Sequence, residues 1–274
     1  MNLLRFRDVI PAKWMQPMEI LVIATAAFLT AILTFFSGFG LGTILMPVFA
    51  LFFPVDVAIA LTGVVHFTNN LFKMALVGKK ADKAVLLRFG IPAVLASFAG
   101  AWLLLKLTGL PALFRYELWG KEIEITPLKL IIAALLMIFS LAEVLHSVQQ
   151  LQFKRNKLIL GGALSGFFGG LAGIQGALRS AFLIKSGLSK ETYIATGVII
   201  ASLVDITRLS VYASRFKASN LHENMNLIVF ATLAAMAGAL LGSLLLKKIT
   251  LRFIQTLVTV MLVLVSLALG SGLI

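Results

Sequence analysis

Long apolar runs cover most of the chain and determine its expected architecture. Runs of this length that carry few charges are typical of helices that cross a bilayer. An all-α polytopic membrane protein is therefore the expected fold class. We expect spanning helices over residues 18–36, 55–77, 84–107, 127–145, 158–172, 191–213, 225–246 and 251–273.

Two shorter apolar runs, over residues 43–53 and 177–186, each follow a glycine-broken segment. The first segment is Ser37–Gly42 and the second is Leu171–Gly176. At about 1.5 Å per residue, each run covers about half of a hydrocarbon core that is about 30 Å thick. We interpret both runs as re-entrant half-helices. The alternative is that each run is part of a broken helix that spans the membrane fully. Interrupted segments at equivalent places in two halves indicate a substrate site near the membrane midplane.

The two interrupted segments belong to a duplication. At an offset of 134 residues, Gly42 falls on Gly176, and the motif Thr62-Gly63-Val64 falls on Thr196-Gly197-Val198. The duplication predicts membrane repeats over residues 18–147 and 158–274, joined by a cytoplasmic linker over 148–157. Each repeat is expected to hold about four spanning helices and one half-helix, and this even number predicts parallel repeats. Residues 1–17 are interpreted as an uncleaved cytoplasmic segment at the membrane interface.

The composition is that of a multi-pass protein of the inner (plasma) membrane. Hydrophobic residues make up 60% of the chain, charged residues make up 13%, and the mean hydropathy is +1.02. The net charge is +13, most of which we assign to the Lys and Arg excess of cytoplasmic loops. With four spans in each half, four basic clusters share one side, so both termini are predicted to be cytoplasmic. These clusters are Arg5/Arg7/Lys13, Lys79/Lys80/Lys83, Lys154/Arg155/Lys157 and Arg215/Lys217, whereas Lys185/Lys190 and Lys247/Lys248/Arg252 oppose this orientation.

Several kinds of chemistry have no support in the sequence. The chain has no Cys, its three histidines are isolated from one another, and no phosphate-binding GxxxxGK[ST] motif occurs. We therefore expect no metal, no cofactor, no nucleic-acid partner and no enzymatic activity.

A polar stripe follows one face of the predicted helix over residues 55–77. Its members fall within about 100° of arc at helical spacing, so they must face protein or water rather than lipid. Each member also has an alternative, structural role. The amides could pack against neighbouring helices, the histidine could occupy a satisfied core position, and the lysine could snorkel to the interface. The stripe consists of Thr62, His66, Asn69, Asn70 and Lys73.

The equivalent helix of the second half carries Ser202, Asp205, Arg208 and Tyr212. Asp205 and Arg208 are three residues apart, so they can pair on one helix face. Charged groups inside a membrane are costly and are candidates for function by default. We expect Arg208 to hold an anion that Asp205 orients, with a purely structural ion pair as the alternative.

Arg179 is the sharpest candidate for an anion ligand. It follows Gly176 by three residues, at a position where the first half has Leu45. A guanidinium there would join the backbone N–H groups of the chain break, and its planar donors suit two oxygens of a sulfonate. The alternative is that Arg179 pairs with Glu143 or Asp205, or reaches the membrane interface. We expect Gly42, Gly176, Gln175 and Ser180 to complete this substrate site.

These motifs resemble those of the sulfite exporter TauE/SafE family of membrane permeases, over nearly the whole chain. The matching residues are Gly38, Gly40, Gly42 and Pro47 in the first half, and Gly166, Gly169, Gly170, Gly173 and Gly176 in the second. The resemblance implies transport of sulfite, of sulfonates such as sulfoacetate, or of related small anions.

We interpret the chain as a secondary transporter that exports a small organosulfonate or sulfite-like anion by alternating access. The alternative is an anion channel or uniporter-like pathway for inorganic oxyanions. Two weaker alternatives are a membrane enzyme that uses His66 as acid or base, and a structural component of the membrane. Besides the anion and membrane lipid, a second copy of the chain is an expected partner. Small-residue faces over 93–101 and 231–239 could pack across the subunits of a homodimer.

Overall fold

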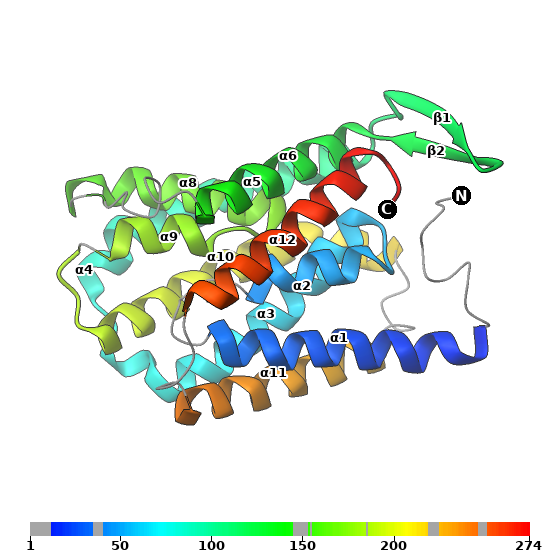
Figure 1. The fold of residues 1–274 in the computed structure, drawn as a ribbon. Coiled ribbons are helices and arrows are strands. Elements are labelled where there is room, and N and C mark those ends of the chain that lie inside the picture. Colours follow the sequence, from blue (N-terminus) through cyan, green and yellow to red (C-terminus); the bar gives the residue numbers. More distant parts are fainter. Residues whose placement is uncertain are drawn as a thin grey trace.

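The computed structural model of the chain describes residues 12–34, 41–144, 153, 155–184, 186–218, 225–245 and 251–274. Helices make up almost all of this part, so the chain has the expected all-α polytopic membrane fold (Figure 1). The predicted ranges agree closely with the observed helices, and two of them, 55–77 and 158–172, match at both ends.

The described residues of the first half form five α-helices of more than three residues. The helix α1 begins at Ala12, upstream of the predicted residue 18, and continues through Pro17. The elements are α1 (Ala12–Thr34), α2 (Leu41–Ala50), α3 (Val55–Val77), a 3₁₀ turn η2 (Gly78–Lys80), α4 (Lys83–Val85), a π-helical turn η3 (Leu86–Gly90), α5 (Ile91–Thr108), β1 (Phe114–Leu118), β2 (Lys121–Ile125) and α6 (Pro127–Val144).

The second half repeats the order of helices. It consists of a 3₁₀ turn η4 (Arg155–Lys157), α8 (Leu158–Ala172), α9 (Gly176–Leu183), α10 (Lys190–Ala218), α11 (Met225–Leu245) and α12 (Leu251–Gly270). The short helices α2 and α9 stand at equivalent places, as the duplicated glycine segments predict.

Four helical segments of the described residues are long and apolar enough to cross a bilayer: Val55–Leu76, Lys83–Thr108, Lys190–Ala213 and Met225–Gly242. Four further apolar stretches are shorter: Pro17–Ile32, Leu41–Ala50, Pro127–Ala142 and Thr259–Gly270. Large apolar side chains on the outer surface, such as Leu95, Phe98 and Leu233, are more than half exposed. Such a surface suits contact with lipid.

The short helices reverse the direction of the chain. The hydroxyl of Ser165 on α8 donates to the carbonyl of Gln175 at 2.9 Å, so α9 turns back along α8. The chain thereby returns to the end at which α8 begins, where the N–H of Phe153 donates to the carbonyl of Ala181 at 3.3 Å. Figure 1 shows that α2 turns back along α1 in the same way.

The two halves consequently run in opposite directions. Helices α3 and α10 are antiparallel, because Gly63 lies beside Arg208 whereas Asn70, further along α3, lies beside Asp205. The prediction of parallel repeats is therefore wrong. The prediction treated each half-helix as a re-entrant loop, which leaves the membrane on the side where it entered. In the structure, each short helix instead carries the chain back to the side where the preceding helix began.

The halves also interlock through two equivalent helix pairs. The first helix of each half packs along a helix of the other half, since α1 packs on α11 and α8 packs on α5. If each helix is replaced by its equivalent in the other half, the pair α1·α11 becomes α8·α5. The pairs α3·α10 and α6·α12, which also contact each other, stay the same pairs under this exchange. This is the pattern of contacts that a two-fold relation between inverted repeats produces.

Small residues bring the backbones of α5 and α8 close together. Gly166 faces the backbone of Ala93, and Gly162 and Gly170 make the same kind of contact one turn to either side. Ala93 is fully buried by this packing. The residues 231, 235 and 239 of α11 are likewise fully buried. The two small-residue faces expected to join subunits are therefore used within the chain, and they give no support to a homodimer.

One end of the bundle carries a β-hairpin, in the connection between the predicted spans 84–107 and 127–145. Strands β1 and β2 pair antiparallel, and the turn places Trp119 and Gly120 at φ values of 52° and 73°. The hydroxyl of Tyr116 donates to the carbonyl of Ser271 at 2.6 Å, so the C-terminal residues lie at this hairpin end (Figure 1). The alternating pattern of the strands is too short to stand out beside the apolar helices.

The opposite end, which we call the basic end, gathers exposed cations from three connections. The N–H of Asp82 donates to Oγ1 of Thr196 at 2.9 Å, which joins the turn after α3 to the first turns of α10. The acidic residues Asp82 and Glu191 also lie there. The cations of the basic end are Lys79, Lys80, Lys83, Arg155, Lys157 and Lys190.

We predict that Gly166→Leu separates α5 from α8, because its side chain would collide with the backbone of Ala93. Overpacking of this kind costs about 1–3 kcal/mol or more, equivalent to a fall of about 2–12 °C in melting temperature for a chain of this size. Thermal unfolding in detergent measures the change. The matched control is Gly109→Ala, where the added carbon would lie 3.8 Å from the carbonyl oxygen of Lys106, an ordinary contact distance. Equal melting temperatures for the two variants would contradict the packing.

Candidate functional site

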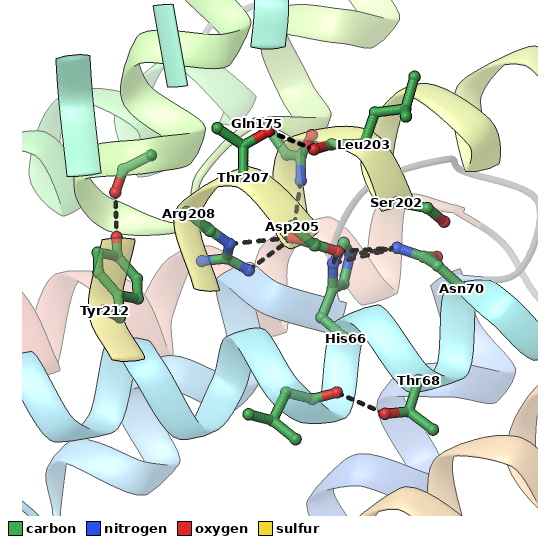
Figure 2. A network of polar contacts seen from close by, with 12 residues as sticks. His66, Thr68, Asn70, Gln175, Ser202, Leu203, Asp205, Thr207, Arg208 and Tyr212 are labelled. Atoms are coloured by element: carbon green, nitrogen blue, oxygen red, sulfur yellow. Dashed lines mark hydrogen bonds and ion pairs between the residues drawn. The ribbon is translucent and has the colours of Figure 1, made fainter. Parts of the chain in front are cut away.

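A fully buried carboxylate, Asp205 on α10, collects hydrogen bonds in the middle of the bundle (Figure 2). Its Oδ2 lies 2.5 Å from Nδ1 of His66 and 3.3 Å from Nδ2 of Asn70, both on α3. Its Oδ1 accepts from Nε2 of Gln175 at 3.2 Å and from Nε of Arg208 at 3.0 Å. The carboxylate therefore joins α3 of the first half to α10 and to the residue before α9 in the second.

The predicted polar stripe of α3 faces the protein interior. Thr62, Asn69, Asn70 and Lys73 are buried, and the side chain of His66 is 13% exposed. An ionised carboxylate can only accept hydrogen bonds, so Nδ1 of His66 carries the hydrogen that points to Asp205. The other ring nitrogen, Nε2, is then an acceptor, and Nδ2 of Asn70 lies 3.5 Å from it.

The predicted pair between Asp205 and Arg208 is formed, with Nη2 of Arg208 2.8 Å from Oδ1. The guanidinium is completely buried between two glycines. A Cβ atom at Gly63 would lie 3.3 Å from Cζ, and one at Gly173 would lie 2.9 Å from Nη1. Glycine at these positions leaves the space that the guanidinium fills.

The two chain breaks meet beside this arginine. Gly173 ends α8 with φ +76°, a conformation that side chains disfavour. A Cβ at Gly42 would lie only 3.2 Å from the carbonyl oxygen of Gly173. Gly176, which aligns with Gly42 when the two halves are compared, is buried at the first position of α9. The residue that the reversal requires to be glycine is therefore Gly173.

A second buried guanidinium, that of Arg179 on α9, lies toward the basic end. Its Nη1 donates to Oε1 of Gln175 at 3.1 Å, so the amide of Gln175 bridges Arg179 and Asp205. Arg179 is 5% exposed and Lys73 is 6% exposed, and the two cations lie within electrostatic range of each other. A Cβ at Gly197 would lie 3.5 Å from Nε of Arg179.

The duplicated Thr-Gly motif thus has one structural role in both halves. Gly63 of the first copy lies against Arg208, and Gly197 of the second copy lies against Arg179. Each copy leaves room for a large cation on a neighbouring helix. The sequence showed the motif but gave no reason for it, because both arginines come from other elements.

Comparison with known families agrees with a transporter architecture. The family model described as Sulfite exporter TauE/SafE matches residues 23–269, which is most of the chain. The chain belongs to the TauE/SafE family. Its members are membrane transporters of the sulfite and sulfonate type, and this chain is such a transporter. Neither a curated protein nor a solved structure matches it.

One polar contact of this TauE/SafE member was missed at the level of sequence. The hydroxyl of Tyr193, in the first turn of α10, donates to Oγ of Ser180 at 2.8 Å. Tyr193 also lies within electrostatic range of Arg179. Two hydroxyl groups therefore stand close to the Arg179 guanidinium. Tyr193 lies within three residues of the Thr196-Gly197 motif, which is the signal that could have found it.

Other candidate residues lie outside the hydrogen-bonded network. Ser202 donates to the carbonyl of Val198 in its own helix, at 3.0 Å. Within the described part of the chain, the amide of Asn69, the hydroxyl of Thr62 and Nη1 of Arg208 are buried without a hydrogen-bond partner. Unpaired buried polar groups are rare, and each of these can receive water or a ligand.

We predict that Asp205→Ala strongly destabilises the transporter, because it leaves the buried cation of Arg208 without its carboxylate. Breaking a buried ion pair in this way costs about 3–5 kcal/mol. Thermal unfolding in detergent measures the loss. The double variant Asp205→Leu, Arg208→Met should recover most of it, and Ser202→Ala, the matched control, should change stability by about 0.5 kcal/mol or less. A single variant that melts like the wild type would refute this view of the network.

Proposed function

We propose that this TauE/SafE protein exports a small organosulfonate or sulfite-like anion by alternating access, and that Arg179 and Lys73 bind the anion. The observation that carries the proposal is an excess of positive charge in the buried middle of the bundle. Arg179, Lys73 and Arg208 are buried there, and Asp205 is the buried carboxylate beside them. The other buried carboxylates of the described residues, Glu19 and Asp56, lie in the first part of α1 and the first turn of α3.

The charge of Asp205 is already balanced by Arg208, which contacts it directly. Two like charges held close together in an apolar region repel each other and lose hydration. An anion between Arg179 and Lys73 would remove both penalties. A ligand of negative charge at this place would therefore be attracted by both cations.

The groups around Arg179 suit an anion with several oxygen atoms. A guanidinium offers two parallel N–H donors to two oxygens of one sulfonate, and an ammonium adds a point charge. The hydroxyls of Ser180 and Tyr193, which are hydrogen-bonded to each other, can serve further oxygens. We assign Gln175 the role of holding Arg179 in place through its side-chain amide.

The inverted halves supply a way to alternate access. In transporters with inverted repeats, broken helices meet near the midplane and the halves move relative to each other. Here the network of Asp205 crosses the boundary between the halves, through His66 and Asn70 on α3. These bonds must lengthen or exchange when the halves move, so we place the moving boundary between α3 and α10.

We propose that the basic end faces the cytoplasm, because cytoplasmic loops carry the excess of Lys and Arg. Six exposed cations against Asp82 and Glu191 mark that end, whereas the hairpin has three glutamates against Arg115 and Lys121. The C-terminus would then lie on the outer side of the inner membrane, together with the start of α1. The loops of Lys79/Lys80/Lys83 and Arg155/Lys157 keep the cytoplasmic side expected from the sequence, whereas the C-terminus and the start of α1 are placed on the opposite side from the one expected. The reason is the reversal at α2, which puts the start of α1 and the turn after α3 at opposite ends of the bundle (Figure 1).

We predict that Arg179→Ala lowers the affinity for sulfoacetate about 10- to 100-fold, the cost of losing a charged hydrogen-bond donor to the ligand. Arg179→Lys should recover part of it, because the charge remains without the fork of donors. Release of sulfoacetate from proteoliposomes and thermal stabilisation by sulfoacetate measure the effect. The control is Arg115→Ala, whose side chain is 60% exposed on the hairpin. Unchanged release by Arg179→Ala would exclude this site.

We predict opposite labelling of two single-cysteine variants, which is a clean experiment because the chain has no Cys. Glu122→Cys on the hairpin should react with a membrane-impermeant maleimide on intact cells. Lys80→Cys at the basic end should react only after permeabilisation. Both positions are exposed, so the matched pair differs in side alone. Labelling of Lys80→Cys but not of Glu122→Cys on intact cells would indicate the opposite orientation and contradict the proposal.

A further inference from the structure

The helical segment Lys83–Thr108, which contains α5, presents one exposed face along its length. Apolar side chains recur on this face at intervals of three or four residues, which is the spacing of one side of a helix. Each of them is more than half exposed, so the face continues the apolar outer surface of the bundle. We call this face the α5 stripe, and its apolar members are Ile91, Leu95, Phe98 and Trp102.

A cation stands at each end of the α5 stripe. Arg88, in the turn η3, lies three residues before Ile91, and Lys106 lies one turn after Trp102. Both cations are exposed, and residues 89–105 between them carry no charged side chain. Nζ of Lys106 lies 5.4 Å from the centre of the Trp102 ring. Tryptophan and lysine are typical of the boundary between acyl chains and headgroups, where the lysine extends its charge to the surface.

The separation of the two cations matches the thickness of a bilayer. Eighteen residues separate Arg88 from Lys106 in the sequence. At about 1.5 Å per residue this is about 27 Å, against a hydrocarbon core about 30 Å thick. Long cationic side chains reach the headgroup region from such positions while their apolar stems stay in the hydrocarbon. The α5 stripe therefore has the length of one complete crossing.

The charges at the two ends favour lipid over a second copy of the chain. Two copies in one membrane that met on this face would be related by a two-fold axis along the membrane normal, so identical patches would lie against each other. Each of the cations Arg88 and Lys106 would then lie near its own counterpart, and like charges repel. The phosphate groups of phospholipids carry the opposite charge and are present in both leaflets. They complement both ends of the stripe.

We propose that the α5 stripe is a lipid-binding surface, on which Arg88 and Lys106 bind the phosphate groups of phospholipids in opposite leaflets. Ile91, Leu95 and Phe98 lie against the acyl chains between these two levels. This inference goes beyond the proposed function, because it holds for any anion and for either direction of transport.

The α5 stripe also gives the depth of the central network. Ser97 lies midway between the two cations of the stripe in the sequence. Gly170 of α8 packs against the backbone of Ser97, and the hydroxyl of Tyr212 donates to the carbonyl of Gly170. Arg208 lies one turn from Tyr212 on α10. The proposal therefore places the ion pair of Arg208 and Asp205 near the middle of the bilayer.

Spin labelling along the α5 stripe tests the proposal in proteoliposomes of phosphatidylglycerol and phosphatidylcholine. The chain has no Cys, so a nitroxide can be attached to single cysteines at the exposed positions 88, 91, 95, 98, 102 and 106. Collisions of the nitroxide are measured with oxygen, which gathers in the middle of a bilayer, and with a nickel complex that stays in water. The ratio of oxygen to nickel collisions should be highest at 95 and 98 and should fall toward both ends. The matched control, Glu122→Cys, is exposed on the hairpin and should collide mainly with nickel.

Two results of this experiment would overturn the proposal. A highest ratio at position 88 or 106 would place the bilayer elsewhere along α5. Low collision rates with both reagents at 91, 95 and 98 would show that protein, such as a second copy of the chain, covers the α5 stripe.

The contacts with phosphate have a separate test, which measures thermal unfolding in detergent micelles. Addition of anionic phosphatidylglycerol should raise the melting temperature more than addition of phosphatidylcholine, because basic groups attract anionic lipids. The double variant Arg88→Gln, Lys106→Gln should lose part of this gain, whereas Arg115→Gln, exposed on the hairpin, should keep it. An undiminished gain in the double variant would refute the assignment of phosphate groups to these two cations.

Discussion

The negative charge of Asp205, buried between the two halves of a membrane protein, is the constraint around which the surrounding helices are arranged. A charge in such a place costs several kcal/mol unless donors surround it. Here the donors come from α3, from the residue before α9 and from α10 itself. Gly63 on α3 and Gly173 after α8 allow these elements to approach the guanidinium of Arg208, which pairs with the carboxylate. The hydrogen bonds of His66 and Asn70 to Asp205 join the two halves.

Glycine makes that approach possible, and the two halves use it unequally. The Thr-Gly motif leaves space for Arg208 in one copy and for Arg179 in the other. The short helices differ more: all ten residues of α2 are buried and carry no charge, whereas α9 carries Arg179 and Ser180. The polar groups that suit an anion are therefore concentrated between the network and the basic end. The duplication explains the shared order of helices in the two halves. The difference between the short helices α2 and α9 explains why polar groups are concentrated beside α9.

Much of the fold follows from local sequence. Helix positions could be predicted because apolar runs of about twenty residues leave few alternatives, and the breaks could be located because glycine recurs at the same offset. The direction of each half could not, since the length of a short helix does not say at which end the chain leaves it. That direction depends on the turn at Gly173 and on packing against α8. The hairpin was missed because two five-residue strands carry little periodic signal.

The site could be predicted residue by residue but not as a network. Spacing alone identified the pair of Asp205 and Arg208, because both lie on one helix. It could not show that Gln175 bridges Arg179 to Asp205, nor that Tyr193 meets Ser180, since these contacts join separate elements. The role of Gly173 was likewise hidden, because its need for a positive φ appears only once the chain turns.

The central claim is that a sulfonate binds between Arg179 and Lys73, on the basic side of the carboxylate network. Crystals grown with 2-bromoethanesulfonate would test it directly, since the anomalous signal of bromine marks the ligand. We predict a bromine peak beside α9, with sulfonate oxygens within hydrogen-bonding distance of the Arg179 guanidinium. A sulfonate bound instead to Nη1 of Arg208 and the amide of Asn69, with Arg179 left without an anion, would contradict it.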